Sequence, residues 1–133
     1  MTTSCKKRSR GFTLIELLIV ISLIVILVSI SVPAYNQSVI RAREAVLKQD
    51  LFELRSLISQ YTLDKEKAPQ SLDDLVSAGY LKQIPKDPFT HAADWMVDQD
   101  DSLMSVDQTD PGISDVHSAS NQVGTDGTAY SSW

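Results

Sequence analysis

Residues 10–17 read Arg-Gly-Phe-Thr-Leu-Ile-Glu-Leu and open an apolar run that extends from Phe12 to Tyr35. Within this run the only ionisable groups are the carboxyl of Glu16 and the phenol of Tyr35. As an α-helix, a run of about 24 residues would be about 36 Å long, enough to cross a bilayer core of about 30 Å. The sequence therefore predicts a membrane-spanning helix at the start of the chain.

The flank of this run predicts its orientation. Lys6, Lys7, Arg8 and Arg10 precede it, and basic flanks stay on the cytoplasmic side, so the rest of the chain is expected to face outward. An ordinary secretory signal peptide has a shorter apolar region and small residues before its cleavage site. An ordinary membrane anchor fits the length, but leaves unexplained a glutamate whose burial at the bilayer centre would cost about 2.5–3.5 kcal/mol.

A basic leader, a Gly-Phe junction, a single glutamate and a long apolar helix occur together in residues 6–35. This combination resembles the processing motif of type IV prepilins and type II secretion pseudopilins. The resemblance implies cleavage between Gly11 and Phe12 by a prepilin peptidase, followed by N-methylation of Phe12. We expect the Glu16 carboxylate to pair with the Phe12 ammonium of a neighbouring subunit in a filament, because pairing removes an uncompensated buried charge.

Pro33 lies late in the apolar run, where it removes one backbone donor. We expect the helix to bend or loosen there when it packs into a filament, and a merely tolerated membrane-helix proline is the alternative. Beyond Pro33, apolar residues recur at three- and four-residue steps, namely Leu47, Leu51, Leu54, Ile58 and Tyr61. The charged residues Arg41, Arg43, Glu44, Lys48, Asp50, Glu53 and Arg55 are expected to lie largely off this stripe.

This pattern predicts one helix from near Thr13 to about Leu63, whose second half packs on a small domain; a free coiled coil is the alternative. A Ser71-Leu72-Asp73-Asp74 capping box predicts a short helix that stops at Gly79. Residues 85–88, Pro-Lys-Asp-Pro, predict a rigid turn. Short strands are expected at 95–97, 103–106 and 112–118, with turns at 98–102 and 109–112. The predicted class is α+β, with a long helix packed on a short helix and a small antiparallel sheet.

The stretch from Ala68 to Pro88 is similar to the major pseudopilin, the G subunit, of type II secretion. In that family a tryptophan and a glycine usually follow the Asp-Pro pair, where this chain has Phe89 and Thr90. Major pseudopilins end in a calcium-binding loop, and residues 118–133 are rich in oxygen side chains and turn residues. The resemblance implies calcium, for which the candidate ligands are Ser118, Ser120, Asn121, Asp126 and Thr128. A solvated tail is the alternative, and Trp133 is expected to dock the tail onto the domain.

Composition excludes several function classes. The 133 residues carry a net charge of −5, and from Pro69 onward the only cations are Lys82 and Lys86. This acidic part argues against nucleic-acid binding, and its many aspartates indicate solubility or, alternatively, cation binding by a few of them. His91 and His117 show no metal-ligand spacing or nucleophile motif and are expected to be ordinary surface histidines, so no enzyme is predicted. The single cysteine, Cys5, allows no intramolecular disulfide.

Together these expectations divide the chain into a cleaved leader (1–11), a transmembrane and filament-core helix (12–35) and a periplasmic pilin-like domain (36–133). The resemblance implies a subunit of a periplasmic pseudopilus that drives type II secretion, anchored first in the bacterial inner membrane. A surface type IV pilin for adhesion, motility or DNA uptake is the alternative, and a membrane-tethered binding module is another. The implied partners are further copies of the chain, prepilin peptidase, minor pseudopilins, membrane lipid, and an inner-membrane assembly platform with its ATPase.

Overall fold

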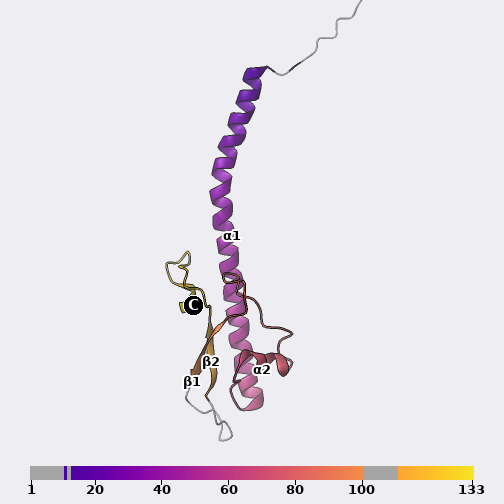
Figure 1. The fold of residues 1–133 in the computed structure, drawn as a ribbon, viewed down its shortest axis with the longest axis vertical. Coiled ribbons are helices and arrows are strands. Elements are labelled where there is room, and N and C mark those ends of the chain that lie inside the picture. Colours follow the sequence, from indigo (N-terminus) through magenta and orange to yellow (C-terminus); the bar gives the residue numbers. More distant parts are fainter. Residues whose placement is uncertain (1–10, 12, 101–110) are drawn as a thin grey trace, which may run out of the picture. The chain divides into compact units, whose positions relative to one another are not determined.

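The computed structural model describes residue 11, residues 13–100 and residues 111–133. Along the chain come α1 (Leu14–Lys65), α2 (Leu72–Ser77), β1 (Met96–Asp100), β2 (Gly112–His117) and the short 3-10 helix η1 (Tyr130–Ser132) (Figure 1). The chain forms two compact units, an N-terminal unit that ends at Ser38 and a C-terminal unit that starts at Val39. This order confirms the predicted α+β class.

The N-terminal unit consists mainly of the first half of α1. Its large apolar side chains from Leu14 to Val32 are each between 46% and 77% exposed. Within the described part of the chain, α1 is the one helix long and apolar enough to cross a membrane, and none of its apolar window is buried against other residues. Such a surface cannot remain in water, so lipid or other helices must cover it.

The C-terminal unit is built on the predicted stripe of α1. Leu47, Leu51, Leu54, Ile58 and Tyr61 are all buried, which confirms the stripe. They form one hydrophobic core with α2, β2, η1 and the residue before β1, which contribute Leu72, Leu75, Ile113, Val116, Tyr130 and Trp95. Figure 1 shows α2 and the sheet beside the C-terminal half of α1. The C-terminal half of α1 therefore forms one side of the core, and the other elements of the unit pack against it.

The structure confirms the predicted start and stop of α2. Its Asp74 carboxylate accepts hydrogen bonds from the main-chain N–H groups of Ser71 (3.2 Å) and Gln70 (2.8 Å), as a capping box requires. Gly79 follows the helix with φ of +86°, a left-handed conformation that favours glycine. The chain then reverses, and the N–H of Tyr80 donates to the carbonyl of Leu75 at 3.0 Å.

The sheet differs in part from the prediction. β1 and β2 pair antiparallel, with a bulge after the Asp98–Asp115 pair. The turn expected at 98–102 is wrong at its start, because residues 98–100 continue β1; the aspartates there lie on an exposed strand. Gly112 begins β2, which confirms the start of the strand expected at 112–118, so the turn expected at 109–112 does not include Gly112. The strand expected at 103–106 lies outside the described residues.

The turn expected at 85–88 is also displaced, to residues 88–90. The reason is the side chain of Asp87, which accepts a hydrogen bond from the Phe89 N–H at 2.8 Å and so starts the turn two residues later. The preceding residues are held instead by Trp95, whose indole N–H donates to the Pro85 carbonyl at 2.7 Å.

Candidate functional site

The start of α1 contains a cap that the sequence reasoning missed. The Thr13 hydroxyl accepts a hydrogen bond from the Glu16 N–H at 3.3 Å, and the Leu17 N–H donates to the Thr13 carbonyl at 3.2 Å. Thr13-Leu14-Ile15-Glu16 is a Thr-x-x-Glu pattern, a known N-terminal signal that could have been read from the sequence. Glu16 thus lies in the first turn of α1, where the helix dipole favours an anion.

The predicted processing residues fall at the edge of the described chain. Gly11 is exposed, and a Cβ added to it would meet nothing within 4 Å. Phe12, the residue predicted to be methylated, lies outside the described residues. Cleavage and methylation therefore stay predictions from the sequence motif.

Pro33 lies inside α1, and the residues around it remain α-helical. The expected loosening therefore stays a prediction for the packed filament. Pro33 cannot donate to the Ser29 carbonyl. Serine hydroxyls in this region find hydrogen-bond acceptors within the helix. Those of Ser29 and Ser31 donate to main-chain carbonyls four residues earlier, at 2.7 and 2.8 Å. Side chains bonded in this way need no water, which suits an apolar environment.

Glu44 holds the C-terminal segment onto α1. It is only 6% exposed. Its carboxylate accepts hydrogen bonds from the Thr125 N–H (2.8 Å), the Thr125 hydroxyl (2.6 Å) and the Tyr130 hydroxyl (2.8 Å). The prediction that Glu44 lies off the buried stripe is wrong. Its position three residues before Leu47 places it in register with the stripe, and this signal was available in the sequence.

The hydrogen bonds of Glu44 decide its charge state. Burial acts to raise the pKa of Glu44, but the hydrogen bonds from Thr125 and Tyr130 outweigh it and lower the pKa. Burial, together with the hydrogen bond to Glu44, raises the pKa of Tyr130 to about 12. The pair is therefore a carboxylate and a neutral phenol near pH 7.

Trp133 docks the tail as expected. The indole N–H of Trp133 donates to the Thr128 hydroxyl at 2.6 Å, and its ring packs edge-on against Tyr130 with centroids 4.9 Å apart. From α1, the Lys48 ammonium lies 4.8 Å from the centre of the Trp133 ring, and Arg55 donates to the main-chain oxygen of Trp133 at 2.6 Å. Residues 44, 48 and 55 thus lie on one face of α1, and their side chains contact the last residues of the sequence.

Four of the five calcium candidates lie in two hydrogen-bond networks. Ser118 and Ser120 are buried; the Ser118 hydroxyl donates to the carboxylate of Asp87, which is itself fully buried. Asp126 is exposed and accepts hydrogen bonds from the Thr128 N–H (3.0 Å) and hydroxyl (2.7 Å), which lower its pKa. Asn121 is exposed. The buried Asp87 carboxylate was missed, because nothing local in the sequence connects it to Ser118.

The two histidines differ. His91 is exposed, as expected. The expectation for His117 is wrong, because its ring contacts groups on three segments: the Trp133 main-chain oxygen, Asp98 on β1 and Asp115 on β2. Asp115 is also bonded by Arg55 at 2.6 Å. Pairing across the sheet, rather than spacing along the chain, brings these groups together.

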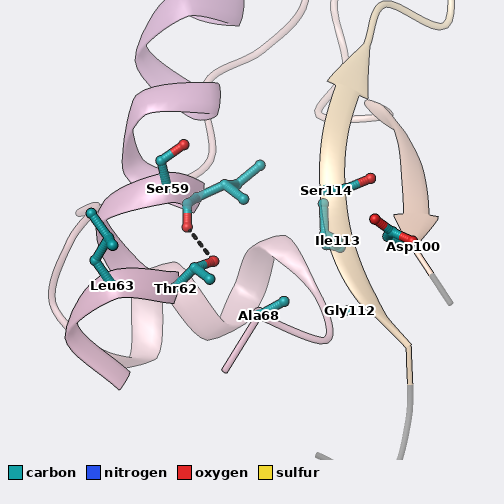
Figure 2. A pocket seen from close by; sticks show the side chains of 9 residues that line it. Ser59, Thr62, Leu63, Ala68, Asp100, Gly112, Ile113 and Ser114 are labelled. Atoms are coloured by element: carbon teal, nitrogen blue, oxygen red, sulfur yellow. Dashed lines mark hydrogen bonds between the residues drawn. The ribbon is translucent and has the colours of Figure 1, made fainter. Parts of the chain in front are cut away.

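A cavity of about 310 Å³ lies between α1 and the sheet (Figure 2). Its lining combines apolar groups such as Ile58, Leu63 and Ile113 with the hydroxyls of Ser59, Thr62 and Ser114. Figure 2 shows that the Thr62 hydroxyl is already bonded to the Ile58 carbonyl, at 2.8 Å. Among the described residues of the lining, Asp100 is the one carboxylate, and neither histidine is among them.

An exposed apolar helix, a helix-start glutamate and a small α+β unit define a pilin-like protein. Comparison with known proteins agrees: residues 6–32 match the prokaryotic N-terminal methylation motif. Type II secretion system core protein G of Aeromonas hydrophila is 32% identical over 100 residues, covering 63% of this chain and 70% of that protein. The chain belongs to this core protein G family of pseudopilins.

Other relatives include a second core protein G and, over a shorter stretch, a fimbrial protein. The core protein G of Escherichia coli K12 is 32% identical over 98 residues, covering 62% of this chain and 68% of its own length. Type IV major fimbrial protein FimA of Dichelobacter nodosus is 35% identical over 65 residues but covers only 49% of this chain and 41% of its own length. No solved structure matches significantly.

Proposed function

We propose that the chain is the structural subunit of a periplasmic pseudopilus that drives type II protein secretion across the outer membrane. The observation that carries the proposal is the unpartnered apolar surface of α1 from Leu14 to Val32, next to a processing and methylation motif. In the inner membrane, lipid covers this surface. In a filament, the same surface packs against the helices of other copies.

Assembly then follows from the chemistry of the first turn. Cleavage after Gly11 leaves an ammonium on Phe12, and methylation keeps that charge. The Glu16 carboxylate of one copy pairs with the ammonium of another, which fixes the axial register. Prepilin peptidase, minor pseudopilins and an inner-membrane platform with its ATPase are the partners that this route requires. A surface type IV pilin is the second candidate, supported by the partial match to the fimbrial protein.

Deletion of the gene tests the proposal. Extracellular proteins of the mutant, the parent and a complemented strain are compared by mass spectrometry. The expected result is the loss of specific folded exoproteins, which accumulate in the periplasm and return to the medium on complementation. Unchanged secretion with loss of surface fibres would assign the chain to the type IV pilins instead. If neither secretion nor surface fibres changed, the proposed filament role would be wrong. The chain would then be assigned as a membrane-tethered binding module.

For the C-terminal loop we propose calcium binding centred on Asp126. Its carboxylate and the Thr128 hydroxyl lie 2.7 Å apart on an exposed turn, and calcium prefers oxygen ligands of this kind. Ser118 and Ser120 fit less well, because their hydroxyls are buried and bonded within the Asp87 network. Calcium should raise the melting temperature of the parent and not that of Asp126→Asn. Insensitivity of the parent to chelator would refute calcium binding.

A further inference from the structure

A different cluster of metal-ligating groups lies on the sheet. Asp98 on β1 and Asp115 and His117 on β2 offer ligand atoms that all lie within 4.8 Å of one another. None of the three belongs to the Asp126 turn. The strand register places Asp98 directly opposite Asp115. Like charges directly opposite each other destabilise a sheet, so a cation close to this pair would stabilise it.

The cations of the chain balance only part of this charge. Arg55 reaches Asp115 through Oδ1, at 2.6 Å, and the Val116 N–H donates to the same oxygen at 2.8 Å. These contacts fix the orientation of the carboxylate and leave its Oδ2 directed at His117, 3.6 Å from Nε2. A bulge lies next to this pair, where β1 passes from Asp98 to Gln99.

The contacts of His117 show which nitrogen faces the carboxylates. Nδ1 lies 2.6 Å from the main-chain oxygen of Trp133, which can only accept, so Nδ1 donates there. Nε2 lies 2.9 Å from Asp98 Oδ2 and 3.6 Å from Asp115 Oδ2. A positive charge at this point, either a proton on Nε2 or a metal ion in its place, offsets the repulsion between the two carboxylates. A carbonyl that fixes the histidine tautomer in this way is the usual outer-shell partner of a metal-bound imidazole.

The donor set, with its imidazole nitrogen, indicates the kind of ion, because imidazole suits Zn²⁺ and related transition metals, and the spacing is compatible with it. In a tetrahedral zinc site with bonds of about 2.0–2.1 Å, ligand atoms lie about 3.3 Å apart. The two Nε2-to-oxygen distances, 2.9 and 3.6 Å, lie on either side of that value. Calcium instead takes six to eight oxygen ligands. We propose that Asp98, Asp115 and His117 form a site for a divalent transition-metal ion such as Zn²⁺, with water as the fourth ligand.

Such an ion would join three segments of the C-terminal unit. It bridges β1 to β2 directly, and reaches the C-terminal segment through the Nδ1 bond to Trp133. The side chains are open to solvent, with 61% of Asp98, 41% of Asp115 and 23% of His117 exposed, so a metal ion and its water can enter without unfolding. Because the ion binds only the folded arrangement, it stabilises the unit by mass action.

The test uses the full chain in detergent micelles with Cys5→Ser, which removes the only thiol. Zn²⁺ is titrated by calorimetry in metal-free buffer, and thermal unfolding is followed with and without it. We expect one Zn²⁺ per chain and a higher melting temperature. Asp98→Asn and His117→Gln should each weaken binding at least about tenfold, because losing even an outer-shell partner costs about 10–100-fold. Asp98 is exposed, so its variant should keep the fold.

His91→Gln is the matched control, because it removes the other, exposed histidine and should bind Zn²⁺ like the parent. Excess Ca²⁺ should not displace Zn²⁺. Equal Zn²⁺ affinity in the parent, Asp98→Asn and His117→Gln would overturn the proposal. It would also be overturned if the parent bound no Zn²⁺. In that case ¹⁵N spectra with both His117 nitrogens protonated would identify a proton as the positive charge between the carboxylates.

Discussion

At the scale of single residues, Glu44 links α1 to the C-terminal segment, and its removal tests that link. Glu44→Gln keeps the size but removes the negative charge that accepts hydrogen bonds from Thr125 and Tyr130. Hydrogen bonds to a charged group are roughly twice as strong as those between neutral groups. We therefore expect a loss of about 1–3 kcal/mol in the free energy of unfolding, measured with urea. Glu53→Gln, an exposed change on the same helix, is the control and should have little effect.

The lowered pKa of Glu44 also predicts a pH dependence. Its stabilisation is fully present above the pKa of an unfolded glutamate, about 4.3, and is lost as the pH falls through the lower folded value. The difference in unfolding free energy between the parent and Glu44→Gln should thus be constant near pH 7. It should shrink below about pH 4. A difference that grows in acid would show that Glu44 is not held as a carboxylate.

At the scale of elements, the second half of α1 carries the core. Leu54 is fully buried there, whereas Leu63 on the same helix is 80% exposed. Leu54→Ala should lower the free energy of unfolding by about 2–5 kcal/mol, because it leaves a cavity among packed side chains. Leu63→Ala should change it by less than about 0.5 kcal/mol. Similar losses in both variants would mean that α1 does not pack through the predicted stripe.

The elements that the sequence predicted are those with local signals. The period of Leu47 to Tyr61, the capping pattern at Ser71 and the left-handed glycine at Gly79 each act within a few residues. The strand expected at 95–97 was found, one residue later at its start, but residues 98–100 of β1 lacked such a signal, because the aspartates there resemble a turn until β2 pairs with them.

Some site residues could likewise be predicted from local sequence signals, and others could not. The Thr13–Glu16 cap and the register of Glu44 with Leu47 were present in the sequence. The Asp87–Ser118 and Asp98–His117 contacts join residues 31 and 19 positions apart and depend on the fold.

At the scale of the whole molecule, the two units have complementary roles. The C-terminal unit buries a hydrophobic core of its own, whereas the N-terminal unit leaves its large apolar side chains exposed. A chain built in this way is stable as a folded unit but is completed only by lipid or by other copies. Glu16 stands at the start of the exposed helix, and two physical roles compete for it: a cap within one chain and a charge partner between chains.

Three variants separate these roles. Glu16→Gln keeps capping ability, because glutamine also serves at this position of a capping box, but removes the charge. Thr13→Ala removes the observed 3.3 Å cap and keeps the charge. If Glu16 pairs with the Phe12 ammonium of a neighbouring copy, Glu16→Gln should insert into the membrane but form few filaments, as counted by electron microscopy of sheared material. Glu16→Ala should fail equally, and Thr13→Ala should assemble. The reverse order, with Thr13→Ala and Glu16→Ala defective and Glu16→Gln normal, would show that Glu16 acts on its own helix, since only the cap would then be missing.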